Sequence, residues 1–152
     1  MATVDQTMMK VQRILTGPMK LRIDLDGERI GVRFTDTSTQ VNVRVIDWGK
    51  GKDGEPRTLV RVTSPVLREV KATPELYRDI LSLERRMWFG HIEVDDDANH
   101  PGMVYLTMCH TLLGDYLDEA ELGTALFGVL NAADGMDEDM QKKFGGKRWA
   151  DA

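Results

Sequence analysis

The chain has 152 residues, of which 41% are hydrophobic and 30% charged, with a formal net charge of −5 and a pI near 5.2; these values are typical of a globular protein and exclude a disordered or fibrous chain. Folding at this length buries roughly 68–70% of the unfolded surface, so a core needs neither disulfides nor a structural metal. We expect one domain over residues 1–152.

The first predicted element is a helix, because four apolar residues recur at helical spacing on one face: Val4, Met8, Val11 and Leu15. Thr16-Gly17-Pro18 follows and is expected to end it, since glycine and proline disfavour continuation of a helix.

Four strands are predicted next, because apolar and polar residues alternate in four successive runs. Asp26-Gly27 lies between the first two runs and is the strongest hairpin signal in the chain. The type I′ turn that it indicates needs positive φ at both central residues. Short connections favour an antiparallel meander with one dry face. The apolar positions are Leu21, Ile23, Leu25, Ile30, Val32, Phe34, Val41, Val43, Val45, Val60 and Val62.

A second helix is predicted to begin at Thr73-Pro74, where threonine suits the cap and proline the first helical position. Its apolar residues run to Trp88 and spread beyond the stripe of about 100° that covers one sheet face. We expect the excess to form a dimer or partner interface that comprises Leu76, Tyr77, Ile80, Leu83, Met87 and Trp88. The competing hypothesis is a monomer in which the last strands or the last helix cover this surface.

A second hairpin and a C-terminal helical region complete the pattern. Ile92 and Val94 alternate in a fifth strand, and Val104, Leu106 and Met108 alternate in a sixth. From Leu117 onwards the pattern is helical, and we expect it to loosen at Asp134-Gly135 before a last turn at 137–144. The predicted fold is α+β, in the order helix, four-stranded antiparallel meander, helix, β-hairpin, C-terminal helix or helices.

Two loops match the letters of ligand-binding motifs without their structural context. Residues 49–54 read G-x-G-x-x-G, but Glu55-Pro56 leads into a strand, whereas a phosphate site needs a helix N-terminus there. Residues 95–99 begin like a calcium loop, but His100 and Leu106 replace the required glycine and glutamate. We therefore predict a solvated hairpin loop and an acidic hairpin turn.

The candidate metal ligands are His91, His100, His110 and the only cysteine, Cys109. The second hairpin would bring His91 opposite Cys109 or His110, but no pair has the spacing of a zinc motif. Cys109 lies in an apolar strand, where a thiol stays protonated and inert. No catalytic motif is found either, so we predict no enzyme, no cofactor and no metal. A ligand- or metal-sensing regulatory domain that uses these histidines stays open as the alternative function.

Basic residues gather in the first half of the chain. Residues 1–71 carry 13 Lys and Arg against 9 Asp and Glu, whereas residues 72–152 carry 7 against 16. Four arginines occupy the polar phase of the first four strands and are expected on an exposed sheet face: Arg22, Arg33, Arg44 and Arg61. Such a row suits carboxylates or phosphates, unless it pairs with strand carboxylates such as Asp24 and Asp26. The acidic pI makes nucleic acid an unfavourable partner.

The compartment is predicted from cysteine usage and from the absence of sorting signals. One cysteine cannot pair within the chain and indicates a reducing compartment. Residues 1–5 lack a basic region followed by an apolar stretch, and no window approaches about 18 apolar residues. We expect a cytoplasmic protein without a membrane partner.

The order of elements, together with three short segments, resembles bacterial YbjN-type proteins, which share a fold with type III secretion chaperones. The segments are Trp88-Phe89-Gly90-His91-Ile92, His110-Thr-Leu-Leu-Gly-Asp115 and Ala133-Asp134 with Phe144-Gly145-Gly146. The resemblance covers nearly the whole chain. It implies a small α+β domain, usually dimeric, that holds partly unfolded or extended segments of a partner polypeptide without nucleotide.

The resemblance also implies where two chains meet, and it supplies no catalytic residues. In the secretion chaperones the helix in the middle of the chain commonly forms the dimer interface, which here corresponds to Leu76 to Trp88. One departure is that four strands precede this helix, where those chaperones have three.

Overall fold

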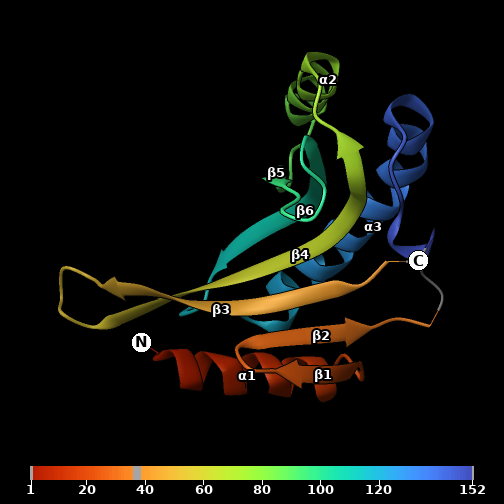
Figure 1. Ribbon diagram of the computed structural model, residues 1–152. Coiled ribbons are helices and arrows are strands. Elements are labelled where there is room, and N and C mark those ends of the chain that lie inside the picture. The colour runs from red at the N-terminus through yellow and green to blue at the C-terminus, as the bar shows by residue number, and fades with distance from the viewer. Residues whose placement is uncertain (1, 36–38, 152) are drawn as a thin grey trace.

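Three α-helices pack against one six-stranded sheet within residues 2–35 and 39–151, which are the residues that the computed structural model describes (Figure 1). In chain order the elements are α1 (Val4–Thr16), β1 (Arg22–Asp26), β2 (Arg29–Arg33), β3 (Val41–Lys50), β4 (Pro56–Lys71), α2 (Pro74–Glu84), β5 (His91–Asp96), β6 (Met103–Leu113), α3 (Glu119–Phe144) and the 3₁₀ helix η1 (Trp149–Asp151).

The sheet is antiparallel throughout and has the strand order β1-β2-β3-β4-β6-β5. The predicted meander of four strands and the predicted second hairpin are both confirmed. The two units form one sheet because β6 pairs along β4, from Leu59 opposite Leu113 to Lys71 opposite Met103. The predicted α+β class is therefore confirmed.

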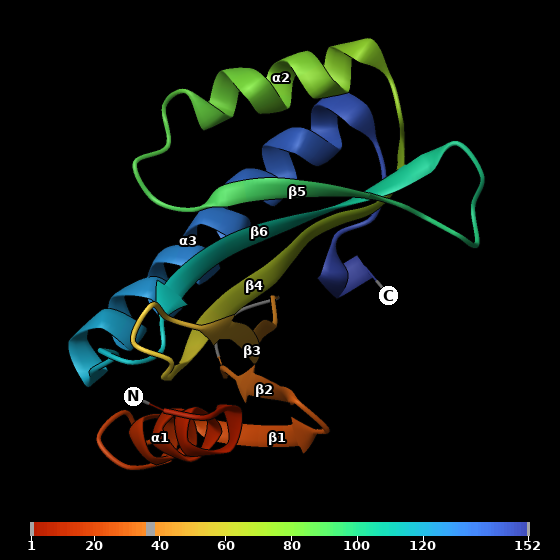
Figure 2. The ribbon, with the colours of Figure 1, turned by 90° about the vertical axis from the view of Figure 1, so that its left-hand side faces the viewer.

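Helices α1 and α3 cover one face of this sheet (Figure 2). The core lies between these helices and the sheet. The alternation of the strands produces this arrangement, since Val41, Val43 and Val45 are buried while Arg44 between them is exposed. Helix α2 lies along the β5 edge and adds Leu76 and Ile80 to the same core. Among the described residues, no helix combines the length and apolar character needed to cross a bilayer.

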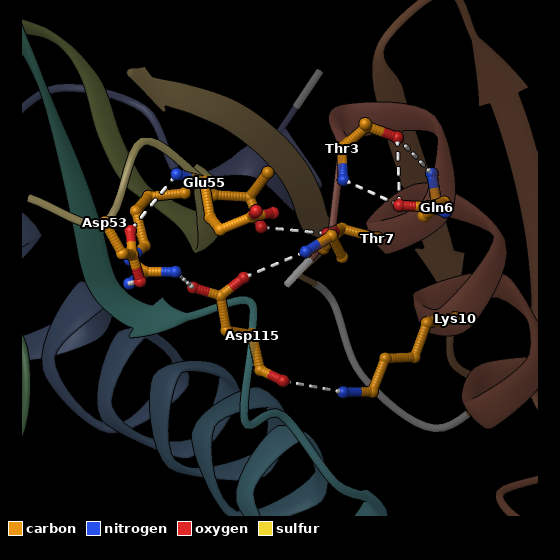
Figure 3. A network of polar contacts seen from close by, with 10 residues as sticks. Thr3, Gln6, Thr7, Lys10, Asp53, Glu55 and Asp115 are labelled. Carbon is orange, nitrogen blue, oxygen red and sulfur yellow. Dashed lines mark hydrogen bonds and ion pairs between the residues drawn. The ribbon is translucent and has the colours of Figure 1, made fainter. Parts of the chain in front are cut away.

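A polar network fixes α1 to the sheet (Figure 3). Thr3 and Gln6 form a capping box at the start of α1. Inside, the hydroxyl groups of Thr7 and Thr58 lie 2.8 Å apart and are buried. Asp115, in the turn after β6, accepts a hydrogen bond from the backbone N–H of Ala2. The network therefore joins the N-terminal helix to β4 and to the turn before α3.

The turn between β1 and β2 differs from the prediction. Asp26 pairs with Arg29, so the two loop residues are Gly27 and Glu28. Only Gly27 has a positive φ, of 58°. A glycine at the first central position with a normal residue after it is the pattern of a type II′ turn, not of type I′. The hairpin was predicted correctly, but its turn type was not.

Helix α2 is shorter than predicted and ends at Glu84, before Met87 and Trp88. Two side chains draw the chain away from the helix axis. The carboxylate of Glu84 accepts a hydrogen bond from the backbone N–H of Ile92 at the start of β5. Phe89 stacks on the ring of His110, with ring centroids 3.8 Å apart. These contacts lead the chain from α2 into β5, so Met87 and Trp88 belong to the segment that connects the two elements.

Helix α3 is continuous, so the predicted loosening at Asp134-Gly135 is absent. A glycine inside a helix costs about 1 kcal/mol relative to alanine, and the burial of apolar residues on either side, such as Ala133 and Met140, outweighs this cost. Asp118 caps its first turn and Gly145 ends it with a φ of 73°.

Strand β4 is irregular near its end, and the C-terminal segment pairs with it there. The register of β4 against β6 shifts between Pro65 and Leu67 and again between Leu67 and Val70. Beyond α3 the chain returns to this region, where Lys147 pairs with Arg68 as an isolated β-bridge. The bridge places η1 against β4.

Candidate functional site

One face of the sheet is left uncovered by α1 and α3 (Figure 2). The strand register shows that side chains on this face form rows across the strands. Residues that are paired on neighbouring antiparallel strands point to the same side. One such row consists of Arg29, Arg44, Arg61 and Thr111. The next consists of Asn42, Thr63, Cys109 and His91. We call the surface formed by these rows and by the strand positions in the same phase the outer face.

The four arginines expected on an exposed sheet face lie on the outer face: Arg22 is paired with Arg33, and Arg44 with Arg61. Arg29 is paired with Arg44 and belongs to the same set. Arg29 was not predicted, although it lies four residues before Arg33 and therefore in the same strand phase.

Several of these arginines pair with neighbouring carboxylates. Arg29 lies 3.0 Å from Asp26, Arg33 lies 2.5 Å from Asp24, and Arg44 lies 3.4 Å from Glu28. The alternative interpretation, pairing with strand carboxylates, therefore describes this part of the surface. All six side chains are more than half exposed, and such ion pairs contribute about 0.2–1 kcal/mol each. The carboxylates of a partner can replace them at small cost.

A denser cluster lies where β4, β6 and β5 meet on the outer face. Arg61 forms an ion pair with Glu93, and its Nη2 lies 3.6 Å from the Sγ of Cys109. His91 Nε2 lies 3.2 Å from Glu93 Oε1. These three side chains lie over Cys109, so the thiol is buried although its position faces outward.

The cluster changes the pKa values of its members. Burial opposes ionisation of Glu93, but the hydrogen bond from His91 and the charge of Arg61 outweigh it and lower the Glu93 pKa. Burial likewise opposes ionisation of Arg61, but the contacts with Cys109 and Glu93 raise the Arg61 pKa. For Cys109, burial dominates and raises the pKa to about 11. Both charged groups stay ionised and the thiol stays protonated at neutral pH.

The other two histidines lie apart from this cluster. His110 is paired with the core residue Val62 and stacks on Phe89, so it lies on the side of the sheet that the helices cover. His100 lies in the β5–β6 loop, with Nδ1 2.8 Å from Asp97. The expected proximity of His91 and Cys109 is present, and Glu93, which was not predicted, lies beside both.

A groove of about 250 Å³ separates η1 from β4 and β6. Its lining includes outer-face residues of both strands, and the exposed rings of Tyr105 and Trp149 contribute aromatic surface. Trp149 also lines a neighbouring depression together with Asp24 and Arg33. The groove was not predicted, because the bulge in β4 and the bridge between Arg68 and Lys147 that form it leave no periodic signal in the sequence. The groove lining consists of Pro65, Val66, Leu67, Arg68, Asp97, Tyr105, Leu106, Thr107, Lys147 and Trp149.

Apolar side chains also reach the surface at the opposite end of the outer face. Ile46, Leu59 and Leu113 are paired in one row across β3, β4 and β6. Leu113 is half exposed, and Trp48, two residues beyond Ile46, is more exposed still. Along the direction of the strands, the outer face therefore carries arginines in its middle. The groove with its aromatic rings lies at one end, and Leu113 and Trp48 lie at the other.

The six residues predicted as a dimer or partner interface are divided by the structure. Leu76 and Ile80 are buried within the chain itself, so they contribute to folding and leave no free surface. Leu83 and Met87 are half-buried and pack against the core. Tyr77 and Trp88 are exposed, as is Leu81, which was not among the six. The surface that α2 and the following segment offer is formed by these three side chains, Tyr77, Leu81 and Trp88.

The two motif-like loops are hairpin connections. Residues 51–55 join β3 to β4, and Arg57 pairs with Asp53 across this turn at 2.7 Å. Asp97 turns the chain between β5 and β6, and its carboxylate accepts a hydrogen bond from the backbone N–H of Asn99. Both predictions are confirmed.

Comparisons with known proteins bear on the whole chain. The model of the family described as T3SS (YopN, CesT) and YbjN peptide-binding chaperone 1, abbreviated TY-Chap1, matches residues 5–152. No curated protein matches the chain.

Two solved structures superpose on the chain. YbjN from E. coli superposes with a TM-score of 0.62 at 10% sequence identity, over 94% of each chain. The ExsC–ExsE complex contains a chain that superposes with a TM-score of 0.49 at 20% identity, over 86% of this chain and 93% of that one. The YbjN superposition shows a common fold and carries no residue-level correspondence.

Proposed function

The chain belongs to the T3SS and YbjN peptide-binding chaperone family, and from this premise we propose that it holds an extended segment of another polypeptide on its outer face. The observation that carries the proposal is the groove beside Tyr105 and Trp149, because it opens on the sheet face that α1 and α3 leave free.

The chemistry of the outer face favours a peptide that carries both apolar and acidic residues. The groove of about 250 Å³ can take a large apolar side chain. Arg33 and Arg44, whose present ion pairs are exposed, can bind carboxylates of the partner. Successive side chains of an extended peptide point to opposite sides, so every second one contacts the sheet. The partner is therefore expected to alternate apolar or acidic residues with residues of any kind.

A peptide array tests this proposal. Sequences that alternate apolar and acidic residues should bind the purified protein, whereas versions with lysine in place of the acidic residues should not. Against a selected peptide, Tyr105→Ala should weaken binding about thirtyfold, as expected for an aromatic contact worth about 2 kcal/mol. Fluorescence anisotropy with a labelled peptide measures this change.

Tyr116→Ala is the matched control, since Tyr116 is an exposed tyrosine outside the outer face. It should bind the peptide like the unmodified protein. Equal losses in Tyr105→Ala and Tyr116→Ala, with both variants folded by circular dichroism, would exclude the groove as the binding site.

We further propose that two chains associate through Tyr77, Leu81 and Trp88. Tyr77 and Leu81 are exposed on α2, and Trp88 is exposed in the segment that follows it. Large exposed apolar side chains of this kind are typical of interfaces, and a two-fold dimer would bury each set against its copy. Leu83 and Met87 would then support this surface from beneath.

The remaining features of the proposal concern the setting of the protein. We propose a cytoplasmic bacterial protein that acts as one domain, without catalysis and without nucleic acid. The single cysteine suits a reducing compartment, and peptide binding by this family requires no covalent chemistry. The pI near 5.2 supports a partner other than nucleic acid.

A further inference from the structure

Three side chains of kinds that ligate transition metals converge on the outer face. His91 and Glu93 are two residues apart on β5, and Cys109 is paired with His91 on β6. One donor atom of each, an imidazole nitrogen, a carboxylate oxygen and Sγ, lies within 4.8 Å of the other two. In a tetrahedral zinc site with bonds of about 2.0–2.3 Å, ligand atoms are about 3.5 Å apart. Small side-chain rotations therefore suffice to close the three donors around an ion.

The backbone beneath these donors is fixed by close packing. Gly90, directly before His91, has a φ of 74°, and a Cβ at this position would lie 2.6 Å from the carbonyl oxygen of Cys109. Only glycine allows β5 to begin so near β6. Phe89, the residue before Gly90, is held in place by its stacking on His110. His91 is therefore held opposite Cys109 by the strand pairing and not by its own side chain.

A cation already lies beside two of the three donors. The guanidinium of Arg61 pairs with Glu93, and its Nη2 lies 3.6 Å from the Sγ of Cys109. The Arg61 side chain is 30% exposed and comes from β4, so it can turn towards solvent without disturbing the β5–β6 pairing. The position between Glu93 and Cys109 thus favours positive charge, and its present occupant is displaceable.

We propose that His91, Glu93 and Cys109 bind a zinc ion in exchange for the guanidinium of Arg61. Imidazole, carboxylate and thiolate are the donors that zinc uses in proteins, and three protein ligands leave the fourth position open. On binding, the Cys109 thiol gives its proton to the buffer and its sulfur bonds to zinc. Glu93 exchanges its ion pair with Arg61 for a bond to the metal. Zinc binding is a property of the free chain and does not depend on the proposed peptide.

Equilibrium dialysis of the tag-free protein against buffered zinc, followed by elemental analysis, tests the proposal. One zinc per chain is expected. His91→Ala and Cys109→Ser should each weaken the affinity at least about tenfold, since even the partners of metal ligands are worth that much. The matched control is His100→Ala, because His100 lies in the loop at the far end of the same hairpin, against Asp97. It should bind zinc like the unmodified chain.

Two further measurements separate this site from adventitious binding. Cobalt(II) in place of zinc should give a thiolate-to-metal charge-transfer band that is absent in Cys109→Ser. Arg61→Gln, which removes the competing cation and keeps a similar length, should tighten zinc binding. The proposal is overturned if zinc is not bound stoichiometrically or if folded His91→Ala and His100→Ala bind it equally. An Arg61→Gln variant with unchanged or weaker affinity would overturn the exchange of Arg61 for zinc.

Discussion

At the scale of single residues, Cys109 shows how neighbours can bury a position that faces outward. Burial raises its pKa to about 11, although the guanidinium of Arg61 acts in the opposite direction. At pH 8 about one thiol in a thousand is therefore ionised, against roughly a quarter in an unfolded chain with a pKa near 8.5. Because the thiolate is the reactive form, iodoacetamide should modify metal-free native protein at least about a hundredfold more slowly than protein in urea. Mass spectrometry over time measures both rates, and similar rates would contradict the burial.

Asp137 is a second residue whose environment sets a measurable property. Its side chain belongs to α3 and is only 3% exposed, and burial raises its pKa, with a smaller contribution from the nearby charge of Asp134. A carboxyl group with a raised pKa in the folded state stabilises the fold below its unfolded pKa of about 3.9, and this contribution is lost as the pH rises.

Asp137→Asn should therefore increase the free energy of unfolding at pH 7, and the gain should shrink as the pH falls towards 4. Urea denaturation at several pH values in this window measures the difference between the two proteins. A gain that is independent of pH, or a loss at pH 7, would show that burial does not govern this carboxyl group.

At the scale of elements, the docking of α1 on the sheet depends on a buried pair of hydroxyl groups, those of Thr7 and Thr58. Thr7→Val keeps the shape of the side chain but removes the partner of the Thr58 hydroxyl. An unsatisfied buried hydroxyl costs about 1–3 kcal/mol. The double variant Thr7→Val/Thr58→Val should recover most of that loss, because no polar group is then left without a partner.

Denaturant unfolding of the two single variants and the double variant forms a double-mutant cycle that measures this coupling. Thr7→Ser serves as the control, since it keeps a hydroxyl at this place. Strictly additive losses would mean that the two hydroxyl groups do not interact.

The elements themselves could be predicted from the sequence where local pattern decides them, and not where tertiary contacts do. The alternation of apolar and polar residues predicted the strands, and Thr73-Pro74 predicted the start of α2. The end of α2 depends on Phe89 reaching His110, which lies on a strand that comes later in the sequence. The continuity of α3 through Gly135 likewise depends on burial against the sheet, which a propensity argument at one residue does not include.

The candidate site, too, could be predicted only where the local sequence pattern decides the position of a residue. The arginines follow from strand phase alone, and Arg29 could have been included on that ground. The meeting of His91 with Cys109 follows from hairpin pairing, but the position of Arg61 above them requires β6 to lie beside β4. The groove at Trp149 requires the C-terminal segment to return to β4. Contacts between residues this far apart in the sequence have no local signal.

At the scale of the whole molecule, the exposed side chains of Tyr77, Leu81 and Trp88 predict that two chains associate. The unmodified protein should have twice the 17.2 kDa mass of one chain in light scattering at high micromolar concentration. Tyr77→Asp combined with Leu81→Asp should give a folded monomer, because both side chains are exposed and their replacement leaves the core intact.

Met9→Asp is the control for this experiment, since Met9 is exposed on α1, away from α2. It should remain dimeric. A mass of one chain for the unmodified protein would contradict the proposed dimer, and an unchanged dimer in the double variant would place the interface elsewhere.

The order of the elements along the chain has a consequence for synthesis. Helix α3 covers the dry side of β4 and β6, yet it follows every strand in the sequence. When the strands have left the ribosome, the apolar side of the sheet still lacks its main cover. Exposed apolar surface of this kind makes a nascent chain prone to aggregation. The chain therefore depends most on the chaperones of the cell during one interval of its synthesis. This interval lies between the emergence of β6 and the docking of α3.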